Sequence, residues 1–82
     1  MKKHSHAFVD EYDGPVGFGL DRETDEKTVA YFLQKFSDDR AVATLSARMS
    51  DAELEELFSL MSRLLKTHLD EDEYHSLFLK DG

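Results

Sequence analysis

The sequence predicts an all-α fold, a small bundle of about four short helices with an irregular N-terminal strap that contains glycine and proline. Two observations lead to this prediction. Apolar residues recur at three- and four-residue steps through much of the chain after residue 20, and helix start signals stand in front of these stretches. We therefore expect an irregular segment at 1–20 and a single helical domain at 21–82.

The clearest helix begins after Ser50. Ser50 and Glu53 match the S-x-x-E capping box, in which each side chain satisfies a backbone N–H at the helix start. The apolar residues that follow share one face at about 100° per residue, and they are Leu54, Leu57, Phe58, Met61, Leu64, Leu65 and Leu69. Such a stripe must be buried, against the rest of the chain or against another molecule. We expect the centre of the core to be Leu57, Phe58, Met61, Leu64 and Leu65, together with Phe32 and Phe36.

Two further helices are predicted before this one. Thr24 is a suitable N-cap for the first, and the acidic residues after it suit the positive end of a helix dipole. Its apolar face is the i, i+3, i+4, i+7 set Val29, Phe32, Leu33 and Phe36. The second helix is expected at Asp38–Arg48. Apolar residues there also alternate as in a strand, but the alanine-rich composition favours a helix.

The two ends of the chain carry weaker signals. Asp70 and Glu73 repeat the acidic version of the capping signal, which predicts a short fourth helix that runs to about Lys80. Near the other end, three glycines and the proline between Gly14 and Gly19 predict turns. The apolar residues around them indicate a strap that lies across the helices. Phe8–Tyr12 is an alternative short edge strand, although no second strand is evident to pair with it.

The composition excludes several classes of function. The formal net charge is −8, so the chain repels nucleic-acid phosphates and anionic membrane surfaces. Cysteine is absent, which excludes disulfides, thiolate metal sites and thiol nucleophiles. No apolar run has the length of a membrane span, and no hydrophobic signal segment follows the start of the chain. We expect a cytoplasmic protein without cofactors.

One group of residues could bind a metal ion. His68, Glu71, Asp72 and His75 offer two imidazoles and two carboxylates, which suffice for zinc if the helix continues through Asp70. The simpler interpretation is that Asp70 starts a new helix and the acidic residues form its first turn. We therefore predict no metal site and keep this group as the alternative, a metal-binding or catalytic accessory protein.

Two large side chains are predicted to lie outside the core. Tyr31 projects away from the apolar face of its helix, and Leu60 lies beyond the edge of the stripe on the longest helix. Together they are candidates for an interaction surface, unless the strap covers them. A chain this short has little room for a pocket of ordinary size, so we expect no catalysis of its own. The expected function is binding of a protein partner or weak self-association.

Overall fold

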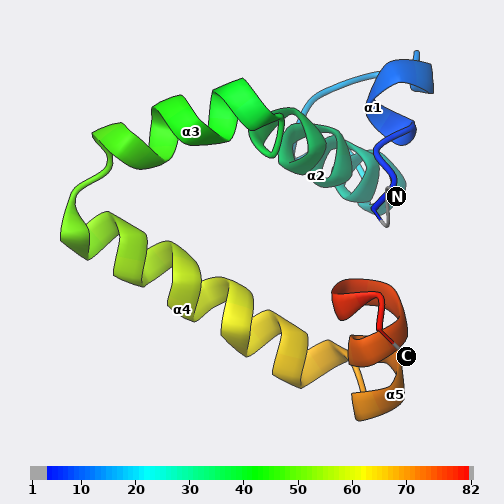
Figure 1. Ribbon diagram of the computed structural model, residues 1–82. Helices are drawn as coiled ribbons and strands as arrows, with labels where there is room; N and C mark the ends of the chain where they lie inside the picture. The colour runs from blue at the N-terminus through cyan, green and yellow to red at the C-terminus, as the bar shows by residue number, and fades with distance from the viewer. Residues whose placement is uncertain (1–3, 82) are drawn as a thin grey trace. The chain divides into compact units, whose positions relative to one another are not determined.

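The computed structural model describes residues 4–81, and these form an all-α structure without a strand. The helices are α1 (Phe8–Glu11), α2 (Arg22–Phe36), α3 (Asp39–Arg48), α4 (Asp51–His68) and α5 (Glu71–Glu73), and a π-helix, η1 (Tyr74–Leu79), continues α5 (Figure 1). The all-α prediction is confirmed. The outer ends of the predicted segments, residues 1–3 and 82, lie outside the described residues.

Contacts divide the chain into two units. One contains residues 5–47, with α1, α2 and nearly all of α3, and the other contains α4, α5 and η1. In the first unit α1 lies beside α2, and in the second the main contact between elements joins α5 to η1 (Figure 1). The single domain expected at 21–82 stays a prediction.

Helix α2 begins earlier than the sequence indicated. Asp21, in extended backbone, is the N-cap, and its carboxylate accepts hydrogen bonds from the backbone N–H of Thr24 at 2.8 Å and from the Thr24 hydroxyl at 3.0 Å. The choice of Thr24 as N-cap was therefore wrong. Aspartate is at least as good an N-cap as threonine, and an N-cap three residues upstream leaves Thr24 in the first turn, where it donates to the cap.

The start signals of α4 and α5 are confirmed in detail. The Glu53 N–H donates to Ser50 Oγ at 3.1 Å, and the Ser50 N–H donates to Glu53 Oε1 at 2.9 Å. Asp70 and Glu73 form the same reciprocal pair at 2.8 and 2.9 Å. Because these bonds join residues three apart, the local sequence is enough to specify them.

Two alternatives based on strands are wrong. Residues 39–48 are helical, and the carboxylate of Asp38 caps them by accepting from the backbone N–H groups of Arg40 and Ala41, both at 3.1 Å. Phe8–Glu11 forms the single turn α1 instead of an edge strand. No strand is present in residues 4–81 to pair with either segment, and an isolated strand leaves its backbone groups without partners.

The predicted core is also wrong. No hydrophobic side chain in residues 4–81 is buried, and Thr28 is the one buried residue among them. Phe58 is 69% exposed and Phe32 is 60% exposed, while Leu57 and Leu65 are half-buried. Helical periodicity shows which residues share a face, but it does not show that another element covers that face. Within the same residues, no helix combines the length and the apolar character that a membrane span requires.

Candidate protein-binding groove

The N-terminal strap, described here over residues 4–20 and including α1, is fastened to α2 by hydrogen bonds to side chains of α2. The backbone N–H of Val9 donates to Gln34 Oε1 at 2.9 Å, near the C-terminal end of α2. The backbone N–H of Gly19 donates to Asp25 Oδ1 at 2.7 Å, near the other end. The strap is thus held along the length of α2, whereas its expected course across the other helices stays a prediction.

Thr28 holds the middle of the strap. Its hydroxyl donates to the carbonyl oxygen of Gly17 at 3.0 Å and accepts from the Gly17 N–H at 3.1 Å, so both backbone groups of one residue are satisfied by one side chain. Thr28 is 6% exposed. Partly buried backbone groups need such partners, since an unpaired N–H or C=O loses its bonds to water.

An apolar groove lies between the attached strap and α2, within the unit formed by residues 5–47. The strap contributes Val16 and Phe18. Helix α2 contributes the apolar face that its periodicity predicted, which is exposed and consists of Val29, Phe32, Leu33 and Phe36. The groove is open to solvent and has a volume of about 460 Å³. Phe18 is 74% exposed and also borders a second part of the groove. We call this site the strap–α2 groove.

Charged residues stand at one end of the strap–α2 groove. Arg22, Asp25 and Glu26 line its second part, around Phe18. Glu26 Oε2 accepts a hydrogen bond from Arg22 Nε at 2.6 Å, and this contact raises the pKa of the guanidinium. Hydrogen bonds from the Thr24 N–H and hydroxyl lower the pKa of the nearby Asp21 carboxyl. Most of the groove is therefore lined by apolar side chains. At one end, the two carboxylates of Asp25 and Glu26 stand beside the single cation of Arg22.

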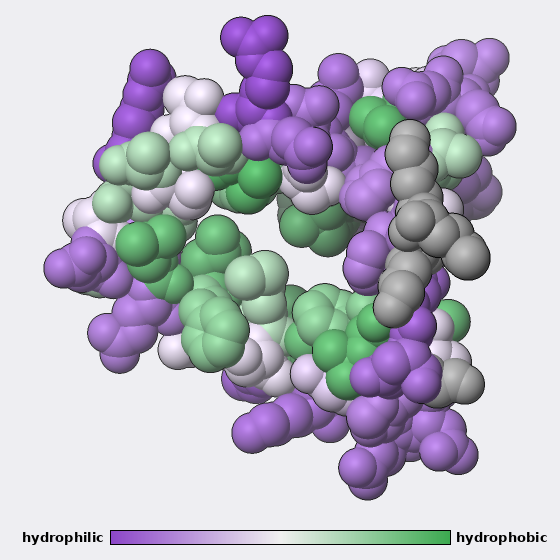
Figure 2. All heavy atoms as spheres, in the orientation of Figure 1, coloured by the Kyte–Doolittle hydropathy of each residue, from purple (hydrophilic) through white to green (hydrophobic). Residues whose placement is uncertain are grey.

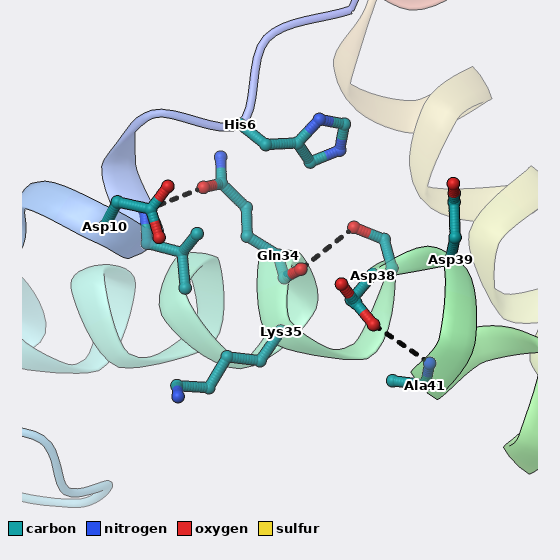
Figure 3. A pocket seen from close by; sticks show the side chains of 9 residues that line it. His6, Asp10, Gln34, Lys35, Asp38, Asp39 and Ala41 are labelled. Atoms are coloured by element: carbon teal, nitrogen blue, oxygen red, sulfur yellow. Dashed lines mark hydrogen bonds between the residues drawn. The ribbon is translucent and has the colours of Figure 1, made fainter.

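A second, polar pocket of about 600 Å³ lies between the start of the strap and the junction of α2 and α3 (Figure 3). Its polar side chains include His6, Asp10 and Gln34. Gln34 already accepts from the strap, and Asp38 is the cap of α3, so these side chains serve the fold. Residues 4–81 contain no group of three or more His, Cys, Asp or Glu side chains placed to hold a metal ion.

The alternative metal ligands do not come together. The helix ends at His68, Leu69 is extended, and Asp70 starts α5, so the chain breaks between the proposed ligands. Glu71 and Asp72 belong to α5, and His75 Nδ1 lies 2.8 Å from Asp81 Oδ1 in a hydrogen bond. The arrangement agrees with the simpler interpretation of this segment. That the protein uses no metal ion stays a prediction.

The two interaction candidates lie in different units. Tyr31 is half-buried, because the centre of its ring lies 5.8 Å from the ring centre of Tyr12 in the strap. Lys35 Nζ lies 5.0 Å from the centre of the same Tyr31 ring. Leu60 on α4 is 43% exposed. The strap therefore contacts Tyr31, and the interaction surface that these two residues were expected to share stays a prediction.

Sequence reasoning missed the strap–α2 groove. Val16 and Phe18 were recognised as apolar, but they were expected to cover the helices and not to leave a groove beside them. The usable signal is the pattern Val16-Gly17-Phe18, because alternate residues of an extended segment point to the same side and the glycine between them permits close approach to α2. No family model, curated protein or solved structure matches this chain.

Proposed function

We propose that this chain is a cytoplasmic protein-interaction module without catalysis of its own, and that it binds an amphipathic helix of another protein in the strap–α2 groove. The observation that carries the proposal is the groove itself, in which six apolar side chains surround a hollow whose wall is fastened by Thr28. Grooves of this kind accept a helix that presents apolar residues at i, i+3, i+4 and i+7.

Charge specifies the partner further. The chain carries a formal charge of −8, and Asp25 and Glu26 stand at the groove end near Phe18. A helix with Lys or Arg beside its apolar face complements these carboxylates, whereas an acidic helix is repelled. Since exposed charges are screened by salt, binding should weaken as ionic strength rises.

The test begins with a photoreactive benzoylphenylalanine in place of Phe18. Irradiation in the cells that make the protein should attach it to its partner, and mass spectrometry should identify the attached segment. The same group in place of Phe78, an exposed ring on η1, is the matched control. Equal products from both positions, or none from position 18, would contradict the proposal.

The identified segment is then synthesised and titrated against variants of the whole chain. Phe32→Glu should weaken binding at least about tenfold, because it places a charge on the groove floor. Phe58→Glu, on α4, should leave the affinity unchanged. Both rings are largely exposed, at 60% and 69%, so neither substitution should unfold its helix, which circular dichroism checks.

A further inference from the structure

The two carboxylates at the charged end of the strap–α2 groove differ in burial and in what already binds them. Asp25 is half-buried, and its Oδ1 accepts a hydrogen bond from the Gly19 N–H at 2.7 Å. Glu26 is exposed, and Arg22 Nε lies 2.6 Å from its Oε2 in an ion pair. The charge of Glu26 is therefore offset within the chain. No cation of residues 4–81 forms an ion pair with Asp25.

The strap fixes the orientation of the Asp25 carboxylate. Gly19 has a φ of +93°, in the left-handed region that L side chains rarely adopt, so the turn there requires glycine. This turn brings the Gly19 N–H to Oδ1 of Asp25. Arg22 attracts Asp25 only through space, and this attraction raises the pKa of the guanidinium less than the contact with Glu26 does. Asp25 is thus a carboxylate that the fold holds in place without neutralising it.

The exposed apolar stripe of α4 has a different arrangement of charge. Figure 2 shows apolar atoms at the surface along this helix. Its charged side chains between residues 55 and 66 lie on the opposite face at about 100° per residue, and they are Glu55, Glu56, Arg63 and Lys66. These charges do not border the stripe, whereas Asp25 borders the strap–α2 groove.

We propose that Asp25 is the residue by which the groove selects its partner, through an ion pair with a Lys ammonium or Arg guanidinium group on the bound helix. This inference rests on the proposed function and names the residue that determines its specificity. A half-buried carboxylate attracts a cation more strongly than an exposed one, because less water screens the pair. Phe18 lines the same part of the groove, and the face of an aromatic ring also attracts cations.

The position of Asp25 also places the cation relative to the apolar contacts. Asp25, Val29 and Leu33 follow one another at four-residue steps along one face of α2, and all three line the part of the groove around Phe18. A Lys or Arg side chain can pack its apolar stem against such a surface while its charged end reaches a carboxylate. The basic residue of the bound helix should therefore lie within about one turn of the residue that contacts Phe18.

Small ions test this selection directly. The probes are n-hexylammonium, n-hexanol and n-hexanoate, which share an apolar chain and differ in charge. Each is titrated into the whole chain, and the backbone amide shifts are followed by NMR. Hexylammonium should bind the groove at least about threefold more tightly than hexanol and should shift the Gly19 amide. Hexanoate should bind more weakly than hexanol.

Asp25→Asn should reduce the affinity for hexylammonium to that for hexanol. Asparagine keeps an oxygen that accepts from the Gly19 N–H, so the strap should stay attached, which hydrogen exchange of the Gly19 amide checks. Glu11→Gln is the matched control. It removes the same charge from an exposed side chain of α1 that does not line the groove, and it should keep the preference for hexylammonium.

A double variant separates the roles of the two carboxylates. Arg22→Gln with Glu26→Gln removes the exposed ion pair and leaves the net charge of the groove end as it was. It should reduce the preference for hexylammonium less than Asp25→Asn does, because an exposed pair contributes little. A larger reduction in the double variant would assign the selection to Glu26 and overturn the proposal.

Three other results would also overturn it. They are the absence of hexylammonium binding at the groove, equal affinities of the wild type for hexylammonium and hexanol, and a preference that survives Asp25→Asn. The segment captured at position 18 gives an independent check. An amphipathic helix without Lys or Arg within about one turn of the attached residue would support the proposed function and contradict selection by Asp25. The two proposals therefore fail separately.

Discussion

The hydroxyl of Thr28 forms two hydrogen bonds with one residue of the strap, donating to the carbonyl oxygen of Gly17 at 3.0 Å and accepting from its N–H at 3.1 Å. These bonds join residues eleven positions apart. They hold Val16 and Phe18, the neighbours of Gly17, beside the exposed apolar face of α2. One buried hydroxyl therefore holds the middle of the strap at the groove that we propose as a binding site.

Thr28→Val should detach the strap at its centre. Valine has nearly the same shape but cannot form hydrogen bonds, so Gly17 keeps two partly buried polar groups without partners. The expected loss of unfolding free energy is about 1 to 3 kcal/mol, measured by urea titration. Thr28→Ser retains the hydroxyl and should lose less. In hydrogen exchange, a Gly17 amide equally protected in Thr28→Val and in wild type would contradict this role.

Ser50→Ala should destabilise the protein by about 1 kcal/mol, because it removes the acceptor for the Glu53 N–H at the start of α4. Ser50→Asp should be nearly neutral, since aspartate accepts the same bond and its charge suits the helix start. Thermal unfolding followed by circular dichroism compares the two variants. Equal losses in both would mean that the capping bond contributes nothing.

Leu64→Ala should cost about 1 kcal/mol in dilute protein, because Leu64 is 41% exposed on α4 and its truncation leaves no closed cavity. Burial in a core, as the periodicity of the stripe suggested, would instead cost about 2 to 5 kcal/mol. Urea unfolding at low protein concentration distinguishes the two values. A loss in the larger range would place Leu64 in a packed interior.

The start of α2 should weaken in acid. The pKa of Asp21 is lowered below 3.8, mainly by the hydrogen bond from the Thr24 N–H and then by that from the Thr24 hydroxyl. A carboxyl with a lowered folded-state pKa stabilises the protein above its unfolded pKa, and this contribution disappears as pH falls through the folded-state value.

The pH dependence can be assigned to this residue with Asp21→Asn. Asparagine caps a helix about as well as aspartate but does not titrate. The wild type should therefore lose more stability than the variant between about pH 4 and pH 2, as measured by urea unfolding at each pH. Parallel stability curves for the two proteins over this range would show that the Asp21 cap contributes no pH dependence.

Folding should require no metal ion. The chain breaks at Leu69 between His68 and the acidic residues of α5, and His75 is hydrogen-bonded to Asp81. The helical circular dichroism signal should therefore be the same with and without a strong chelator. Loss of that signal on chelation, restored by zinc and abolished by His75→Ala, would instead support the alternative metal-binding function.

The sequence by itself determined the fold class and most helix ends. Ser50 with Glu53, and Asp70 with Glu73, form the expected caps because each bond joins residues three apart. The start of α2 was the exception, because Asp21 and Thr24 were both suitable caps and propensity alone does not choose between two such neighbours.

Only the tertiary structure decided which faces are covered. Periodicity placed Phe32 and Phe36 on one side of α2 correctly, but their exposure depends on where the strap lies. That position is set by bonds such as Thr28 to Gly17 and Gln34 to Val9, which join residues 11 and 25 positions apart. Local patterns carry no information about such pairs. The helices after residue 20 could therefore be predicted from the sequence, whereas α1 and the groove required the structure.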